Sequence, residues 1–415
     1  MSRPNRLSGL LPPTALERNL ALQSVLSAFA TGSFLTGTAV FFTQIVGLSG
    51  AQVGLGMSVA AAVGLALSIP LGRLTDRVGA KPLWIVTALL EAGLYFIWPL
   101  IGSFAAFVVM LAVLASVETA GRAARQVYRI AAFPRDTRVR AMAYQRAARN
   151  VGYTLGAGAG GVALGIGTRE AIIAVPLLTG ALLVVNAVMV AGLPAIERPP
   201  DVETDLEAMG PAAWRNRGYV GVALCNAVLA SNQQLLNVVV PLWLVERTDA
   251  PQELLAWLFG TNTVLAVALQ VRAARGADSV AGGLRAFRWS GYAFLASCLV
   301  ISVTHETVGW VSIVLIWVGH VTITGAELWQ SAGDWSLSVE LADARRQGDY
   351  QGLWGMGYSV ESIVFPALYT FLALTWGPPG WLVIAALALA ATALAHPAAR
   401  AAERHLVRVG APVAA

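Results

Sequence analysis

Twelve apolar stretches, each about as long as a bilayer is thick, recur along this 415-residue chain. Inside a bilayer every backbone polar group must be bonded within its segment or to protein around it, so such long continuous runs indicate helices. Only 12% of the residues are charged, against the roughly 25% usual in soluble domains. The sequence therefore predicts an all-α membrane protein with twelve transmembrane helices and no large extramembrane domain. The expected spans lie near 22–46, 52–71, 82–103, 104–126, 141–167, 171–193, 219–245, 254–271, 286–304, 307–335, 351–375 and 379–397.

The spans fall into two equal groups around a polar interruption. Residues 194–217 carry four prolines and five acidic residues, a composition typical of a flexible linker. We expect an N-terminal six-helix bundle at 1–193, a cytoplasmic linker at 194–217 and a C-terminal six-helix bundle at 218–415. Two equal groups of spans indicate a duplicated architecture with a central cavity between two bundles.

The basic residues predict the orientation. They comprise 27 arginines and the single Lys81, and 26 of the 28 fall in segments that share a side with the chain ends. Only Arg169 and Arg247 fall on the opposite side. By the positive-inside rule both termini are cytoplasmic. The net charge of +5 is then a topology signal, and it gives no reason to expect a nucleic acid partner.

The sequence contains no catalytic constellation. The only lysine follows Ala80 and precedes Pro82, which excludes a phosphate-binding loop of the Gly-Lys-Ser/Thr type and therefore direct ATP hydrolysis. Neither a His-Glu-x-x-His metal motif nor a Gly-x-Ser-x-Gly nucleophile turn occurs. Cys225 and Cys298 both lie inside apolar runs, as packing residues do. We expect no enzyme activity, no metal and no cofactor.

The loop between the second and third spans, residues 72–81, carries a recognisable motif. It resembles the major facilitator superfamily signature Gly-x-x-x-Asp-Arg-x-Gly-Arg-Lys, with Ala80 in place of the expected arginine. Glycine permits close helix approach and a tight turn, and an aspartate can face the positive amino-terminal end of a neighbouring helix. The resemblance implies a conformational role; a solvated loop is the alternative. The matching residues are Gly72, Asp76, Arg77, Gly79 and Lys81.

The fifth span contains a second motif at 152–161. It resembles the antiporter signature of the same superfamily, Gly-x-x-x-Gly-Pro-x-x-Gly-Gly, with Ala157 at the proline position. Glycines four residues apart form a flat stripe on which another helix can pack closely. The resemblance implies an exporter that exchanges substrate for protons; ordinary small-residue packing is the alternative. The glycines of the motif are Gly152, Gly156, Gly160 and Gly161.

The fourth span departs from the family pattern. Gly121 fits the usual Arg-x-x-x-Gly pattern, but Val117 occupies the arginine position and Glu118 stands beside it. Because Arg122 lies one turn from Glu118, the two can neutralise each other. Glu118 is either part of proton coupling or half of a structural ion pair. For Glu91, in the third span, we expect a structural or assembly role.

The tenth span carries one polar face. Its polar residues step by four, three, four and three positions, which places them on the same side of a helix. Acids inside spans are rare and costly, and burial disfavours their charged form, so they are candidates for taking up and releasing a proton. The face lines either a water-filled cavity or a set of hydrogen bonds between helices. Its members are His320, Thr324, Glu327, Ser331 and Asp334.

Glu327 is the first candidate for proton coupling, and Glu118, Asp334 and Glu361 follow it. The expected substrate cavity adds His320 and further polar or aromatic residues of the seventh and tenth spans. The amides there either bind substrate or hold helices together. Trp329 offers an aromatic wall or anchors the helix at the membrane interface. These cavity candidates are Asn226, Gln233, Asn237 and Trp329.

The resemblance covers almost the whole chain and implies a secondary transporter. The branch that it is most similar to is the twelve-span drug:proton antiporters of actinobacteria, which matches the arginine-rich composition. We expect a proton-coupled exporter of small apolar compounds, drugs or natural products, in a bacterial inner membrane. The expected partners are a small-molecule substrate, protons and the lipid bilayer, and the expected state is a monomer. An importer or facilitator of a metabolite and a non-transporting membrane sensor are the alternatives.

Overall fold

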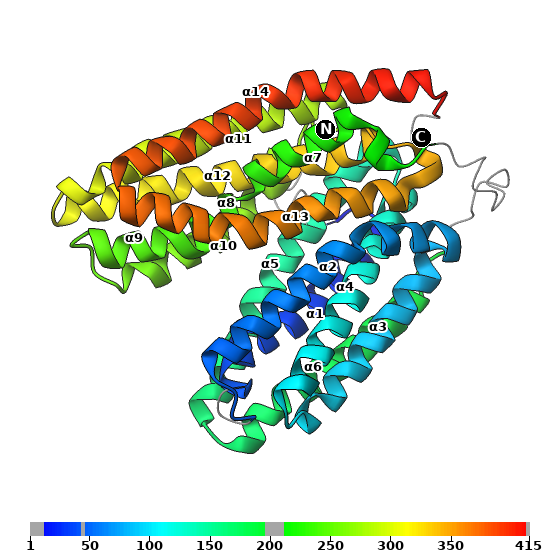
Figure 1. The fold of residues 1–415 in the computed structure, drawn as a ribbon, viewed down its shortest axis with the longest axis horizontal. Helices are drawn as coiled ribbons and strands as arrows, with labels where there is room; N and C mark the ends of the chain where they lie inside the picture. Colours follow the sequence, from blue (N-terminus) through cyan, green and yellow to red (C-terminus); the bar gives the residue numbers. More distant parts are fainter. Residues whose placement is uncertain (1–11, 43–45, 196–210, 412–415) are drawn as a thin grey trace, which may run out of the picture. The chain divides into compact units, whose positions relative to one another are not determined.

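The computed structural model describes residues 12–42, 46–195 and 211–411, and every regular element in these ranges is helical (Figure 1). In the described residues, each expected span overlaps one helix or consecutive helices; residues 43–45, at the end of the first span, lie outside them. In the described part of the chain, nine helical stretches are long and apolar enough to cross a membrane. An all-helical protein with several spans is thus confirmed, and the number of twelve crossings stays a prediction. The expected linker lies largely outside the described residues.

The three expected spans that are not among these nine stretches form α1, α5 and α10. For α5 the reason is visible in the sequence, because its first half carries five arginines between Arg135 and Arg149. That half lowers the hydropathy of the whole helix. The helix that contains the span expected at 141–167 begins before it, at Arg135.

Contacts within the chain divide it into two compact units: Met1–Pro134 with Ala141–Ala208, and Arg135–Arg140 with Met209–Ala415. In the first unit α2 packs on α4, and α6 packs on α1 and α3. An aromatic cluster fills its core, with the ring of Phe42 4.2 Å from that of Phe107 and 5.1 Å from that of Trp98. The helices of this unit are α1 (Ala15–Val40), α2 (Gly50–Val78), α3 (Ala80–Ile97), η2 (Trp98–Leu100), α4 (Phe104–Ala132), α5 (Arg135–Ile166, after its first turn) and α6 (Arg169–Ala191).

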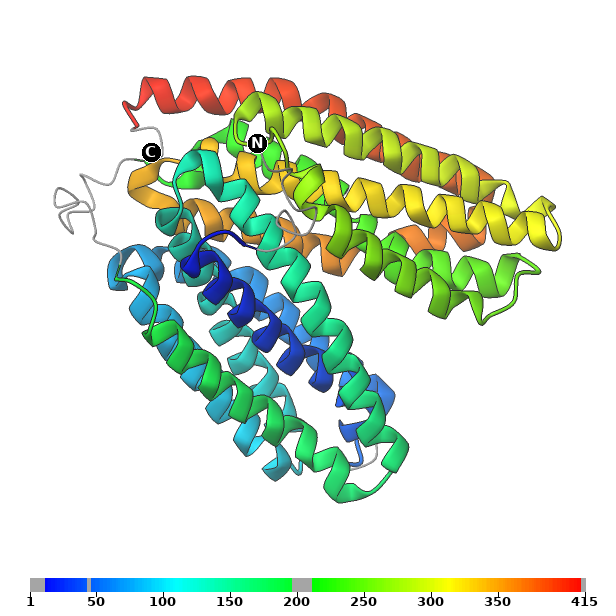
Figure 2. The ribbon, with the colours of Figure 1, turned by 180° about the vertical axis from the view of Figure 1, so that it is seen from behind.

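In the second unit α11 packs on α12 and α14, and α14 also packs on α7, as both views show (Figure 2). Trp243 and Trp381 meet edge to face in its core, with ring centroids 5.4 Å apart. The helices of this unit are η3 (Ala213–Arg215), α7 (Arg217–Ala230), α8 (Asn232–Gln234), η4 (Leu235–Val239), α9 (Val240–Arg247), α10 (Leu254–Ala273), α11 (Val280–Ser302), η5 (Thr304–Glu306), α12 (Trp310–Glu340), η6 (Ala344–Arg346), α13 (Gln347–Thr370), η7 (Phe371–Trp376) and α14 (Pro378–Arg408).

The seventh expected span is not one regular helix. It runs through α7, α8, the π-helical turn η4 and α9. A π-turn adds a residue to the helical turn and shifts the side chains after it around the helix axis, which is why such turns are frequent at functional sites. In this chain the π-turn carries Asn237, one of the residues expected in the substrate cavity.

Candidate functional site

The polar face of α12 is buried along its whole length. The helix is continuous from Trp310 to Glu340, so the residues spaced by three and four positions do share a side. His320 is 3% exposed and Glu327 is 4% exposed. Two hydroxyls of the face form hydrogen bonds within the helix itself. Thr324 and Ser331 each donate to the backbone carbonyl four residues earlier. The two acids of the face take hydrogen-bond partners from other helices.

Glu327 receives its partner from α10. The Asn262 amide donates from Nδ2 to the carboxylate oxygen Oε2 of Glu327 at 3.0 Å and to the hydroxyl of Thr324 at 3.1 Å. Since Thr324 itself donates to a carbonyl, its oxygen is the acceptor here, which fixes the orientation of the amide. One side chain of α10 thus bridges two members of the polar face.

Asp334 belongs to a different set of contacts, with α7 and α13. Its Oδ1 accepts from the indole N–H of Trp354 at 2.6 Å and from the amide of Asn226 at 3.0 Å. Asn226 in turn accepts from the amide of Gln330 at 2.7 Å. These four side chains are all buried and join three helices. The cytoplasmic end of the face, as the sequence orients it, therefore holds helices together.

The other two proton-coupling candidates lie on other helices. Glu361 of α13 accepts a hydrogen bond from the amide of Gln234 at 2.8 Å. Glu118 of α4 lies in the first unit, within electrostatic range of Arg122 and Arg125. Within the second unit, the three expected carboxylates Glu327, Asp334 and Glu361 thus accept hydrogen bonds from different side chains.

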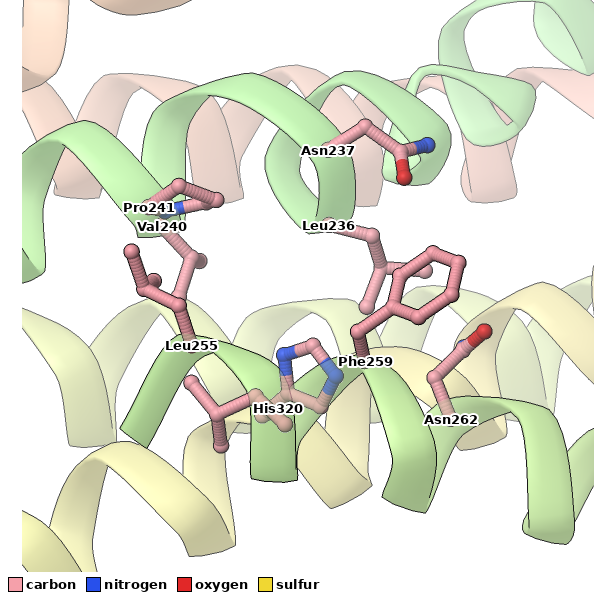
Figure 3. A pocket seen from close by; sticks show the side chains of 9 residues that line it. Leu236, Asn237, Val240, Pro241, Leu255, Phe259, Asn262 and His320 are labelled. Atoms are coloured by element: carbon pink, nitrogen blue, oxygen red, sulfur yellow. The ribbon is translucent and has the colours of Figure 1, made fainter. Parts of the chain in front are cut away.

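A cavity of about 300 Å³ opens beside His320, between η4 with α9, α10 and α12 (Figure 3). Its wall is mainly aliphatic, with one aromatic ring from Phe259. Asn262, the partner of Glu327, is part of this wall. The cavity therefore adjoins one of the expected proton-coupling carboxylates through a single amide. Its lining residues are Leu236, Asn237, Val240, Pro241, Leu255, Leu258, Phe259, Asn262 and His320.

Two of the residues expected in a substrate cavity, His320 and Asn237, line this one. Gln233 contacts Asn237, which donates to the backbone carbonyl of Gln233 at 2.9 Å. Asn226 lies in the network of Asp334. Trp329 packs on Trp289 of α11, with ring centroids 6.0 Å apart, and is not among the lining residues. The structure thus separates the five candidates by their surroundings.

The motif at 72–81 forms the end of α2 and the turn into α3. Gly79 has a φ of 96°, in the left-handed region that L side chains avoid, which is a physical reason for glycine at this position. Lys81 donates to the backbone carbonyl of Leu193, just after the end of α6. The role proposed for Asp76 at the end of another helix stays a prediction.

The glycine stripe of α5 lies against α1. A Cβ atom on Gly156 would lie 2.2 Å from the carbonyl oxygen of Phe29, and one on Gly152 would lie 2.3 Å from that of Val25. Such distances leave no room for a side chain. Gly161 has open space around it. The stripe explains close packing of these two helices, and it does not decide between an antiporter motif and ordinary packing.

Sequence reasoning missed Asn262. It lies in α10, inside a run whose hydropathy indicates only a membrane span. A polar amide between two threonines in that run, in the segment Thr261–Thr263, was the available signal. Its importance depends on what faces it across α10 and α12, which the order of residues does not contain.

A family comparison places this architecture. The model described as Major Facilitator Superfamily matches residues 20–359, most of the chain. The chain belongs to the major facilitator superfamily. Members of this superfamily are transporters rather than enzymes, so the chain is a multi-pass membrane protein with a transporter fold. The resemblance that the sequence motifs carry is thereby confirmed at the level of the superfamily, and the drug:proton antiporter branch is not.

Solved structures show the same fold at low sequence identity. FucP, a major facilitator superfamily transporter in the outward conformation, aligns with a TM-score of 0.70 and 16% identity over 95% of this chain and 99% of its own. A bacterial homologue of the iron transporter ferroportin, in the outward-facing state, aligns with a TM-score of 0.71 and 11% identity over 94% and 100%. A further structure, of the E. coli fucose:proton symporter, has a TM-score of 0.70 and 14% identity over 92% and 98%. No curated protein sequence matches the chain.

Proposed function

We propose that this transporter exports small, largely apolar compounds in exchange for protons, by alternating access. The observation that carries the proposal is the hydrogen bond between Asn262, in the wall of an apolar cavity, and the buried carboxylate of Glu327. A substrate in the cavity would then contact the same amide that donates to the carboxylate that carries the proton. Such proximity is what coupling between two ligands requires, since each must change the free energy of binding the other.

The wall of the cavity supports the apolar character of the substrate. Five of its nine residues are aliphatic or proline, one is phenylalanine, and none is charged. Transfer of apolar surface from water into such a cavity is favourable, by about 25 cal/mol for each Å² buried. A strongly polar metabolite would leave its hydrogen-bonding groups unpaired there, which is costly.

The outward direction rests on the glycine motif of α5, which resembles the antiporter signature. The stripe at Gly152 and Gly156 lets α1 and α5 approach each other closely.

The test is transport in inverted vesicles with and without an imposed pH gradient. We expect accumulation of a labelled apolar compound in the vesicles when their interior is acidic, as export from the cell requires. Glu327→Gln keeps the size of the side chain and removes its exchangeable proton. It should abolish the response to the gradient, by at least about tenfold in initial rate, and spare substrate counterflow.

Glu403→Gln is the matched control, because Glu403 is exposed on the last helix, α14. It should transport like the parent. If Glu327→Gln still responds fully to the gradient, the proton site lies elsewhere, and Glu118→Gln and Glu361→Gln are the next variants to measure. Accumulation driven in the opposite sense would show uptake rather than export.

A further inference from the structure

His320 is a buried histidine with unused hydrogen-bonding capacity. Its side chain lines the cavity between α10 and the π-turn (Figure 3) and is 3% exposed. Among the residues that the structure describes, neither ring nitrogen meets a well-aligned hydrogen-bond partner; the Leu258 backbone comes near the ring. A buried polar group without a partner carries an uncompensated desolvation cost, so such groups are rare unless something else satisfies them.

The two amides of the cavity wall have their hydrogens engaged inside the protein. Asn262 donates to Thr324 and Glu327, and Asn237 donates to the carbonyl of Gln233. In the described part of the chain, no hydrogen bond reaches the Oδ1 atom of either asparagine. What the amides still offer to a ligand is therefore an acceptor, and only the imidazole offers both a donor and an acceptor.

These groups define the chemistry of the occupant. We propose that the cavity binds a compact, neutral, apolar molecule that carries a hydroxyl group, and that this hydroxyl bonds to His320. A hydroxyl both donates and accepts, so it can satisfy the imidazole and reach an amide oxygen as well. An anion or cation would find no charged side chain among the lining residues to offset its desolvation.

Size narrows the class further. A cavity of about 300 Å³ lies at the small end of the range of roughly 300–1,000 Å³ for ligand pockets. Phenols, terpene alcohols and similar one-ring molecules match these requirements. As a statement about substrate, the inference rests on the function proposed above; as a statement about binding, it is tested without transport.

The experiment compares three probes that share one carbon skeleton. Thymol carries a hydroxyl, p-cymene lacks it, and the isopropylbenzoate anion carries a charge instead. Binding to the full chain in nanodiscs is measured by calorimetry, and the signal from empty nanodiscs is subtracted. We expect saturable binding of thymol, binding of p-cymene at least about tenfold weaker, and no saturable binding of the anion, because one lost hydrogen bond of a buried group is worth roughly that factor.

Variants locate the binding in this cavity. His320→Leu should reduce the affinity for thymol to that for p-cymene and leave p-cymene unchanged. Val240→Phe should fill the cavity and remove the binding of both. His396→Leu is the matched control, since His396 is exposed on α14, and it should bind like the parent.

Equal affinities of the parent for thymol and p-cymene would overturn the inference, and that comparison needs no variant. Retention of thymol preference by His320→Leu would also overturn it. The two proposals fail separately. If Glu327→Gln responds to a pH gradient like the parent while thymol discrimination persists, the proposed coupling is wrong and the site remains. If thymol and p-cymene bind equally well while Glu327→Gln abolishes the response to the gradient, the proposed site is wrong and the proposed coupling remains.

Discussion

At the scale of single residues, the buried acids of the second unit differ in the helices that supply their hydrogen-bond donors. Asp334 receives two strong donors, the indole of Trp354 and the amide of Asn226, and joins three helices. Glu327 shares one amide, that of Asn262, with a hydroxyl. A carboxylate that anchors several elements is a structural group first. We therefore expect Asp334 to act mainly in stability, although the sequence alone made it a candidate for proton coupling.

Asp334→Ala tests this assignment. The substitution leaves the indole N–H of Trp354 and the amide of Asn226 buried without their acceptor. Each stranded donor costs about 1–3 kcal/mol, so the free energy of unfolding should fall by at least about 2 kcal/mol and the thermal midpoint by several degrees. Tryptophan fluorescence of the purified protein on heating measures the midpoint. Glu403→Ala, at an exposed position, should leave it unchanged; an unchanged midpoint for Asp334→Ala would contradict the structural role.

At the scale of elements, the contact between α1 and α5 depends on atoms that are absent. The bare backbone of Gly152 and Gly156 packs against Val25 and Phe29 of α1. Gly32 of α1 packs against α5 in the same way, since a Cβ there would lie 2.7 Å from a carbonyl oxygen of α5. In membranes, helix association is driven largely by close packing and hydrogen bonds, because lipid tails remove the hydrophobic drive. The glycines therefore allow the backbones of these two helices to approach each other closely.

Gly156→Ala should force the two helices apart. Its methyl group would lie 2.2 Å from the carbonyl oxygen of Phe29, and backbone cannot yield as a flexible side chain does. We expect a loss of about 1–3 kcal/mol in stability, as in other overpacked interiors. Gly158→Ala is the control on the same helix, because a Cβ there meets nothing within 4 Å. It should be neutral or stabilising, since alanine favours helices over glycine. Equal stability of the two variants, measured by thermal unfolding, would show that the stripe does not set the packing.

At the scale of the whole molecule, the arginine distribution predicts the orientation in the membrane. Arg169 begins α6 and Arg247 ends α9, and both are exposed. Arg404 is exposed near the end of α14. The positive-inside rule assigns the first two to the outer side and the third to the cytoplasm.

Single cysteines at these three positions test the orientation in a background lacking Cys225 and Cys298. A membrane-impermeant thiol reagent should label cysteines at Arg169 and Arg247 in intact cells. A cysteine at Arg404 should be labelled only after the membrane is permeabilised. The reverse pattern would invert the topology, and with it the sense in which Glu327 faces the proton gradient.

The sequence by itself determined the helical class, the positions of the apolar segments and the superfamily, because these depend on properties that are local in the chain. A helix that crosses the bilayer requires about 20 apolar residues in a row, and a polar helical face requires a fixed spacing of residues. Both patterns are visible in the order of residues alone. The polar face of α12 was predictable for this reason.

The tertiary structure alone decided what that face contacts. Spacing identifies a polar side of a helix but not its neighbours, and so the alternatives of a cavity and of helix packing stayed open. The structure separates these alternatives. His320 lines the cavity and Glu327 adjoins it through the wall residue Asn262. Asp334 instead accepts hydrogen bonds from α7 and α13. These partners lie 20 to 108 residues apart, and only the packing of whole helices brings them within hydrogen-bonding distance.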